Sequence, residues 1–214
     1  MLVYWILFGI IFWSMEAMTG RTYHLVEVGL DRVIPFCEWF VFAYFFWHIY
    51  IIGAMVYFLF TDKKVFVQYM WFVILTYSLT LLVYAVYPTM QTLRPQTLDG
   101  DGMLLDIVRW LYGFDTNTNV CPSLHIIGSF SVCFAAFNCE RFRHWAIRTA
   151  FAFVTTIICL STAFLKQHSV LDIFWGAVVS AVAYPLVFME NKVSNTLIRL
   201  FLSTNKKCGV NYEG

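Results

Sequence analysis

Six apolar stretches, each about as long as a helix needs to cross a lipid bilayer, limit the fold of this 214-residue chain more than any other feature. A span needs about 20 predominantly apolar residues. The stretches cover residues 2–18, 35–60, 65–87, 121–139, 145–164 and 170–190. Because lipid offers the backbone no hydrogen-bond partners, such segments fold as helices rather than as open strands. We therefore expect an all-α polytopic membrane protein with six transmembrane helices and a single domain over residues 1–214.

The composition excludes an ordinary soluble domain. Hydrophobic residues make up 60% of the chain and charged residues only 13%, whereas about a quarter of a typical soluble domain is charged. The first stretch is the weakest of the six. We interpret it as an uncleaved span rather than a signal peptide, because no Lys or Arg precedes it and Glu16-Ala17-Met18 is a poor cleavage site.

The distribution of basic residues predicts an orientation. Nine of the 14 Lys and Arg residues follow even-numbered spans, and the other five, after odd-numbered spans, are Arg21, Arg32, Arg94, Arg109 and Lys166. By the positive-inside rule, both termini are expected in the cytoplasm. The net charge of +1 gives no indication of a nucleic-acid partner. We expect an integral protein of the plasma membrane, and the sequence leaves open whether it forms a homo-oligomer.

The six cysteines show no spacing typical of a metal site. Cys133, Cys139 and Cys159 lie within apolar stretches and are expected to act as small packing residues. For Cys37 and Cys121, a disulfide bond on the outer face is an alternative to two separate thiols.

The connection from Pro88 to Asn119 is much longer than two helices need, and long loops are often functional. Within it, apolar residues recur at helical spacing over 102–113. Trp110 and Tyr112 suit the headgroup level of a bilayer. We expect a short interfacial helix that covers a site, with a partly buried connecting helix as the alternative.

His168 and Asp172 lie at the mouth of the last stretch, four residues apart, so a helix places them on one face. A carboxylate in that position fixes the tautomer of the imidazole and leaves the other ring nitrogen able to attack phosphorus or take a proton. An isolated pair of this kind is more often structural. Its position at a span mouth favours a functional role, because ionisable residues in lipid cost a few kcal/mol.

A second histidine lies at the start of the fourth stretch, in Pro122-Ser123-Leu124-His125. Pro122 suits the first turn of a helix, and the free N–H groups of that turn favour an anion. The Ser123 hydroxyl adds a donor, and His125 adds an acid–base group. Taken alone, this segment is better explained as a simple helix start.

Arg94-Pro95 lies in the long loop, where a guanidinium group can bind phosphate oxygens, although a lone loop arginine is usually solvated. Together the elements resemble the three-part signature of the type 2 phosphatidic acid phosphatase superfamily, which includes lipid phosphate phosphatases, polyprenyl diphosphate phosphatases and vanadium haloperoxidases. The resemblance extends over residues 84–185, and six spans with an outward-facing site are usual among the membrane members. The residues that carry it are Arg94-Pro95, Pro122-Ser123-Leu124-His125, Ser161, His168 and Asp172.

The resemblance implies a metal-independent phosphatase without a cofactor. Its substrate would be a lipid phosphate in the membrane, either a phosphatidic acid-like phosphomonoester or a polyprenyl diphosphate. His168 would attack phosphorus and form a phosphohistidine, Asp172 would orient it, and His125 would protonate the leaving oxygen. The residues expected to bind the phosphate oxygens are Arg94, Ser123, Ser161 and Lys166.

Two positions depart from the family's pattern. Tyr87 stands where a Lys is usual, and Thr162 stands where an Arg is usual. Two strong charge-assisted contacts to phosphate are therefore missing, and Lys166 is expected to replace one of them. A related branch, similar to the sphingomyelin synthase-like headgroup transferases, keeps the His/His/Asp core without those cations. Transfer of a phosphoryl headgroup to an alcohol is therefore the alternative activity.

A non-catalytic membrane protein, such as a transporter or a scaffold, is the alternative of another class. A transporter is expected to place ionisable groups near mid-membrane and to contain internal repeats. The candidate residues here cluster at span mouths instead, which favours an enzyme. His48, near the middle of the second stretch, is expected to be hydrogen-bonded within the bundle.

The last stretch contains small residues at helical spacing, with Gly176 and Ser180 four positions apart. Such a pattern favours close contact between helices in a membrane. We expect it to bring the last span, with His168 and Asp172 at its mouth, against the fourth.

Overall fold

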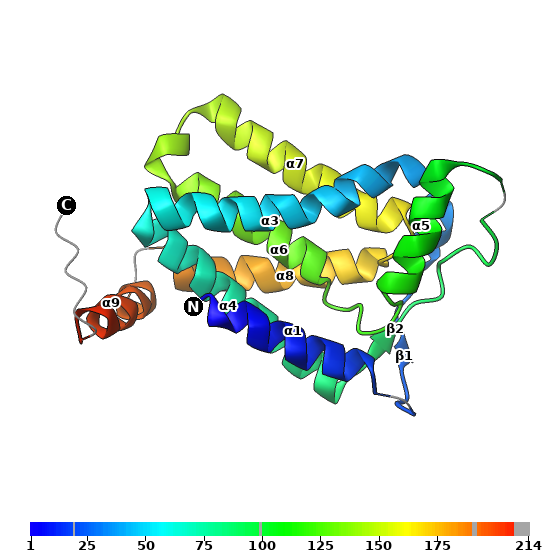
Figure 1. Cartoon of the computed structure of the whole chain (residues 1–214), viewed down its shortest axis with the longest axis horizontal. Coiled ribbons are helices and arrows are strands. Elements are labelled where there is room, and N and C mark those ends of the chain that lie inside the picture. Colours follow the sequence, from blue (N-terminus) through cyan, green and yellow to red (C-terminus); the bar gives the residue numbers. More distant parts are fainter. Residues whose placement is uncertain (19, 99, 190–191, 208–214) are drawn as a thin grey trace.

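The computed structural model describes residues 1–18, 20–98, 100–189 and 192–207, except for the side chains of Lys192 and of residues 201–207. It is an antiparallel helix bundle with loops gathered at one end and the N-terminus at the other (Figure 1). The bundle helices are α1 (Val3–Glu16), α3 (Val41–Thr61), α4 (Lys63–Val86), α6 (Leu124–Asn138), α7 (Trp145–Phe164) and α8 (Val170–Val187).

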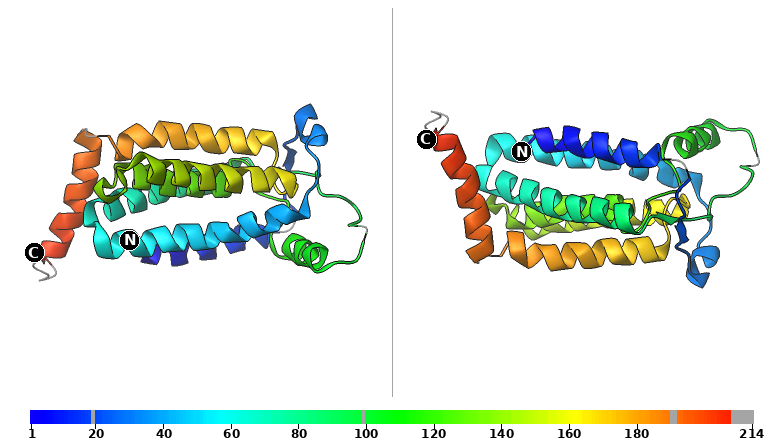
Figure 2. Two further views of the ribbon diagram at one scale, coloured as in Figure 1. Left: turned by 90° about the horizontal axis from the view of Figure 1, so that it is seen from above. Right: turned by 90° about the horizontal axis from the view of Figure 1, so that it is seen from below.

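Short elements occupy the two ends of the bundle. The loop end contains β1 (His24–Leu25), α2 (Gly29–Val33), η1 (Glu38–Phe40), β2 (Thr89–Met90) and α5 (Met103–Phe114). The opposite end contains η2 (Glu140–Phe142) and α9 (Lys192–Lys207). Figure 2 shows α5 beyond the ends of the bundle helices on one side and α9 lying across the bundle on the other.

The helices confirm a mostly helical membrane protein. Four are long and apolar enough to cross a bilayer: α3 together with η1, α4, α7 and α8. The other two apolar helices, α1 and α6, have 14 and 15 residues. At a rise of 1.5 Å per residue each is about 21–23 Å long, shorter than the roughly 30 Å hydrocarbon core of a bilayer.

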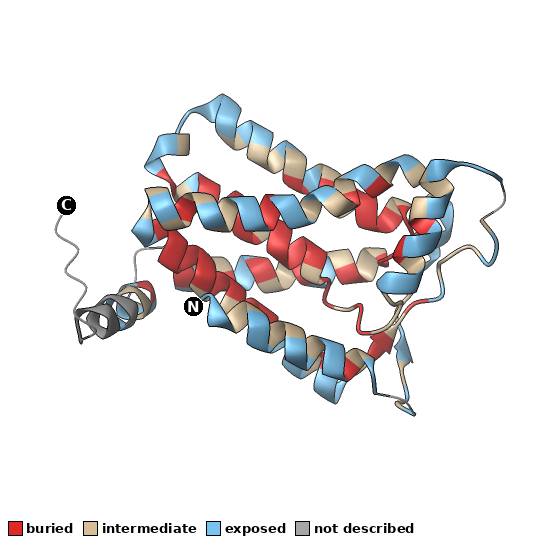
Figure 3. Ribbon diagram, in the orientation of Figure 1, coloured by how far each residue is buried: buried red, intermediate tan, exposed pale blue. Residues whose placement is uncertain are grey.

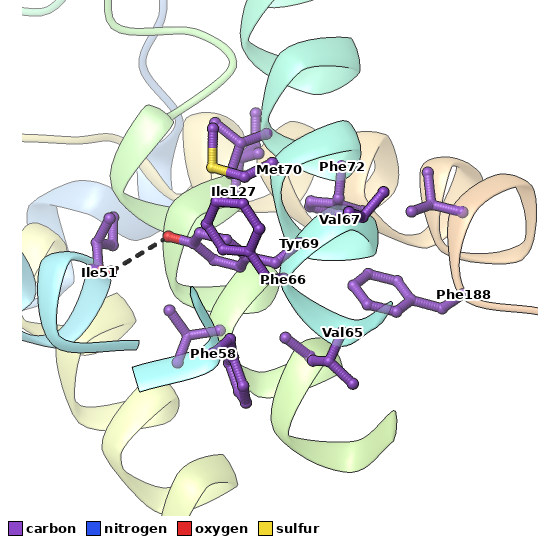
Figure 4. Close-up of a cluster of buried hydrophobic side chains, with 14 of the residues drawn as sticks. Ile51, Phe58, Val65, Phe66, Val67, Tyr69, Met70, Phe72, Ile127 and Phe188 are labelled. Carbon is purple, nitrogen blue, oxygen red and sulfur yellow. Dashed lines mark hydrogen bonds between the residues drawn. The ribbon is translucent and has the colours of Figure 1, made fainter. Parts of the chain in front are cut away.

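Helix α6 is the centre of the bundle and packs against α4, α7 and α8. Its side chains are mostly buried, whereas α1, α3 and α7 expose apolar faces to the outside (Figure 3). A cluster of buried side chains fills the space between α3, α4 and α6 (Figure 4). Within it the Tyr69 hydroxyl donates to the backbone oxygen of Ile51 at 3.3 Å, so this buried hydroxyl has a hydrogen-bond partner inside the core.

Helix α6 begins later than the sequence predicts. Pro122, expected in the first helical turn, lies before the helix, and Ser123 is the N-cap in an extended conformation. Neighbouring elements hold this segment extended, because the Tyr84 hydroxyl donates to Pro122 O at 2.6 Å and Ser123 N donates to Asp172 O at 3.2 Å. Tertiary hydrogen bonds thus override the local preference of proline for a helix start.

Two further predictions are modified by the structure. The two-residue strands β1 and β2 pair in parallel and connect two loops at the loop end of the bundle. The all-α expectation did not include this pairing. The thiols of Cys37 and Cys121 are separate, so the alternative of a disulfide bond is wrong.

The predicted helix over 102–113 is present as α5, and its Val108 and Leu111 are buried while Met103 and Trp110 are exposed. The last predicted stretch ended at residue 190, which lies outside the described residues.

Gly176 brings α8 into close contact with α6, as the small-residue pattern predicts. A Cβ atom at this position would lie 2.8 Å from Ile126 Cβ and 3.1 Å from the backbone oxygen of Ser123. Because these atoms belong to a β-branched side chain and a backbone, they cannot move aside cheaply.

We expect Gly176→Ala to lower the free energy of unfolding by about 1–3 kcal/mol through overpacking against α6. The matched control is Gly53→Ala in α3, where a Cβ would meet no described heavy atom within 4 Å. Thermal unfolding of both variants in detergent measures the difference. Equal unfolding midpoints for the two variants would contradict close packing at Gly176.

Candidate active site

His168 and Asp172 are positioned by the start of α8. Ser169 is the N-cap, and its hydroxyl accepts from Leu171 N at 3.1 Å. In return, Asp172 Oδ2 accepts from Ser169 N at 2.9 Å, the reciprocal arrangement of a capping box. The same oxygen lies 3.2 Å from His168 Nδ1. The carboxylate therefore holds Nδ1 as the protonated nitrogen and leaves a lone pair on Nε2.

His125 lies opposite His168, in the first turn of α6. Its Nδ1 is 3.3 Å from His168 Nε2, so the two imidazoles are in direct hydrogen-bond contact. The rings of Tyr44 and Trp47 lie 4.4 Å and 4.3 Å from the His125 ring. Trp47 Nε1 also donates to His125 O at 3.0 Å. Helix α3 thus fixes the imidazole by packing on its ring and bonding to its backbone.

Ser123, two residues before His125, has an unsatisfied hydroxyl. The residue is fully buried as the N-cap of α6, and its Oγ has no hydrogen-bond partner among the described residues. Buried hydroxyls are normally bonded, since leaving one unpaired costs about 1–3 kcal/mol. A ligand oxygen at this helix start would satisfy it.

Arg94 reaches the site through Gln167. One of its terminal nitrogens donates to Tyr112 O at 2.9 Å, and the other donates to Asp115 O at 2.5 Å and to the Gln167 side-chain oxygen. The guanidinium group also lies over the Tyr112 ring, 4.6 Å from its centroid. Its Nε has no partner among the described residues. The cation is therefore close to the histidines, but most of its donors are already engaged.

Two of the predicted phosphate-binding residues have other contacts. Lys166 Nζ donates to the backbone oxygens of Asp31 and Ile34, at the end of α2. The Ser161 hydroxyl donates to Ile158 O within α7, at 2.6 Å. Tyr87, at the position where a Lys is usual, stacks on the ring of His24. Arg94 thus differs from Lys166 in bonding to a side chain of the cavity wall, that of Gln167.

A cavity of about 40 Å³ lies against His125 and His168. Its volume exceeds that of a single water-sized site. The rest of the wall includes polar residues, among them Gln167, Asp115 and Asn119, and the aromatic residues Phe12 and Tyr84. No group of three or more His, Cys, Asp or Glu side chains in the described part of the chain is arranged to hold a metal ion.

Asp31 is a site residue that the sequence did not reveal. Its buried carboxylate accepts from the Ser169 hydroxyl at 2.7 Å, from Val170 N at 2.8 Å and from Val28 N at 2.7 Å. The first outer loop therefore holds the start of α8, and with it His168. The contact joins residues about 140 positions apart, and no local pattern marks it.

Glu16 is the second such residue. At the end of α1, its carboxylate accepts from the hydroxyls of Thr116 and Thr118 and from the side-chain amide of Asn119. The polar stretch 115–119, which leads into the Pro-Ser-Leu-His segment, is thereby attached to α1. The sequence shows the polar stretch but not its partner.

Comparisons of the chain with models of protein families, with curated proteins and with solved structures returned no significant match. The function is therefore inferred from the residues of this chain and their geometry.

We expect Asp31→Ala to lower the free energy of unfolding by about 1–3 kcal/mol, because it leaves one buried and two partly buried donors without an acceptor. The matched control is Asp106→Ala in α5, whose side chain is 70% exposed and pairs only with Arg109 among the described residues. That variant is expected to change the free energy by less than about 1 kcal/mol. Denaturant unfolding compares the two, and equal losses would argue against a holding role for Asp31.

Proposed function

We propose that this chain is a six-span membrane lipid phosphatase that works through a phosphohistidine, with its site on the extracytoplasmic face of the plasma membrane. The observation that carries the proposal is a chain of two contacts. Asp172 Oδ2 lies 3.2 Å from His168 Nδ1, and His168 Nε2 lies 3.3 Å from His125 Nδ1. It supplies a nucleophilic nitrogen with a fixed tautomer and an acid–base group beside it.

In the first step, His168 Nε2 attacks the phosphorus of the lipid phosphate. The N–P bond forms as the bond from phosphorus to the lipid oxygen breaks. His168 Nδ1 keeps its proton, which stays hydrogen-bonded to Asp172. His125, as the imidazolium that a nearby phosphate dianion favours, gives its Nδ1 proton to the leaving oxygen and becomes neutral. A phosphate must separate the two imidazoles as it enters, because phosphorus lies between the nucleophile and the leaving oxygen.

In the second step, neutral His125 takes a proton from water. The resulting hydroxide attacks phosphorus, the N–P bond breaks, and phosphate leaves with the oxygen atom of the water. His168 recovers its lone pair, and His125 is again the imidazolium. The two steps consume one water and return both imidazoles to their starting protonation.

Three unsatisfied donors support a phosphate ligand at the histidines, because they belong to residues close to a histidine in sequence or bonded to such a residue. They are the hydroxyl of Ser123, Nε of Arg94 and the side-chain amide nitrogen of Gln167. Donors aimed at developing negative charge typically contribute a few kcal/mol to a transition state. Ser161 and Lys166, whose donors bond to the backbone, are not included in this set.

The six-span topology rests on α1 and α6 as well as the four longer helices. Both are apolar and antiparallel to their sequence neighbours in the bundle. A short helix is accommodated by local thinning of the bilayer, at a fraction of a kcal/mol per Å. With basic residues enriched after even-numbered spans, the positive-inside rule places the loop end, and the site, outside the cytoplasm.

Transfer of a phosphoryl headgroup to an alcohol is the second candidate. The small number of cations near the histidines favours it, because Lys166 bonds to backbone oxygens and the neutral Tyr87 stands where a Lys is usual. A phosphodiester carries one negative charge and needs fewer cations than a phosphomonoester dianion.

We expect His168→Ala and His125→Ala each to abolish phosphate release from a panel of lipid phosphates and prenyl diphosphates, and Asp172→Asn to lower it about a hundredfold or more. His144→Ala, an exposed histidine at the opposite end, should retain activity. An acid-labile phosphoryl label should appear on His168 in the wild type. Equal turnover in all variants would end the phosphohistidine hypothesis, and product formed only with an alcohol-bearing acceptor lipid would select the transferase.

Asp115 is expected to make substrate binding depend on pH. Removal from water raises the pKa of its carboxyl, which accepts from the Tyr44 hydroxyl and lines the cavity. The neutral form tolerates a phosphate, whereas the ionised form repels it, so KM should rise as pH rises through this pKa. Asp115→Asn, neutral at every pH, should show a flatter KM profile, while the exposed Asp106→Asn should follow the wild type. Parallel profiles for all three proteins would contradict this role.

A further inference from the structure

The histidine cavity adjoins a larger, mainly apolar chamber. The chamber has a volume of about 290 Å³ and shares Phe12, Asp115, Thr116, Leu124 and His125 with the smaller cavity. Helix α1 contributes Phe8 and Trp13 to its wall, and α5 closes it with Leu111 and Phe114. An apolar space that opens from a polar site can hold the part of a ligand that follows its polar head.

Beyond the chamber, a groove of about 510 Å³ runs between α1 and α3. Trp47 and His48 line both spaces, so the groove adjoins the chamber on the side toward the opposite end of the bundle. The remaining wall consists of Leu2, Trp5, Ile51, Ile52 and Met55. From Tyr44 to Met55 the apolar path follows α3 for about 16 Å, at 1.5 Å per residue.

The groove opens sideways, where a membrane would surround the bundle. Helix α1 packs mainly against α4 and has no comparable interface with α3 among the described residues. Leu2 and Ile52, on the two sides of the groove, are 46% and 55% exposed. A hydrocarbon chain could therefore pass from the bilayer between α1 and α3 without crossing a layer of water.

His48 is a polar residue in this otherwise apolar wall. The sequence led us to expect it to be hydrogen-bonded within the bundle, but it is exposed and makes no hydrogen bond to another described residue. Its ring packs edge-on against Trp47, whose other contact is the ring of His125. An ionisable residue in a membrane-spanning helix indicates a functional partner. His48 faces both the chamber and the groove, so a ligand in either space is within its reach.

We propose that the groove between α1 and α3 binds a hydrocarbon chain of the lipid phosphate, and that His48 bonds to a carbonyl or hydroxyl oxygen between chain and phosphate. The inference rests on the proposed function and selects, within it, an acyl or hydroxyl-bearing lipid phosphate over a polyprenyl diphosphate. The phosphate lies at His125 and His168, the oxygen-bearing linkage lies in the chamber, and the chain leaves through the groove into the bilayer.

Photo-crosslinking in nanodiscs tests the groove without requiring turnover. A lipid phosphate that carries a diazirine on a long acyl chain should label residues of the groove, above all Ile51, Ile52 and Met55. Excess long-chain lipid phosphate should compete with the label, and the same amount of diacylglycerol should not. Labelling spread evenly over the outer faces of the bundle, or equal competition by both lipids, would overturn the proposal. Because the readout is binding, a protein that releases no phosphate can still confirm or refute the groove.

Chain-length dependence tests the groove in the active protein. Ile52→Trp narrows the groove and should raise the ratio of KM for a hexadecyl-chain substrate to KM for a butyl-chain substrate about tenfold. The matched control is Leu82→Trp, on an exposed face of α4 away from the groove, which should leave the ratio unchanged. Equal ratios in the two variants would overturn the proposal.

His48→Phe tests the linkage. This variant should raise KM about fivefold for a substrate with an ester near the phosphate, as expected from the loss of one hydrogen bond, and should not raise it for an alkyl phosphate of equal length. Ile49→Phe, the neighbouring residue outside the groove, is the control. The same change in KM for both substrates would overturn the role of His48.

Discussion

Asp172 connects the starts of α6 and α8, on which the site depends, through its carboxyl group and its backbone oxygen. One side-chain oxygen holds both the N-cap of α8 and the Nδ1 of His168. The backbone oxygen of the same residue accepts from Ser123 N, at the start of α6. The starts of two helices, and the two histidines they carry, are therefore fixed against each other by a single buried residue. Gly176, one turn further along α8, permits the close approach that this arrangement needs.

Two acidic residues, the buried Asp31 and the partly buried Glu16, hold the remaining segments of the site end. Asp31 connects the first outer loop to α8, and Glu16 connects α1 to the stretch 115–119. Each carboxylate accepts several hydrogen bonds, which offsets the cost of removing its charge from water. As a result the vicinity of the histidines contains more acidic than basic groups. The site therefore differs from a phosphate-binding site in which several cations alone hold a highly charged phosphate.

Much of the fold could be predicted from the sequence, because apolar length and helical spacing are local properties. The stretches 145–164 and 102–113 correspond closely to α7 and α5, and the pairing of His168 with Asp172 follows from their spacing of four. The start of α6 was predicted wrongly, since hydrogen bonds from Tyr84 and to Asp172 decide it. The roles of Asp31 and Glu16 could not be predicted, because they arise only when distant loops meet.

In the six-span arrangement that we propose, helix α1 links the site to the thickness of the membrane. It has 14 residues, or about 21 Å, while the helices beside it are longer, so the bilayer around it must be thin or its ends must draw in polar groups. Its end is attached through Glu16 to the stretch beside His125, and its side forms one wall of the groove. A thicker bilayer would pull on this helix at both ends. The width of the groove and the position of the stretch 115–119 would then change together, making the composition of the surrounding lipid a determinant of the geometry at the histidines.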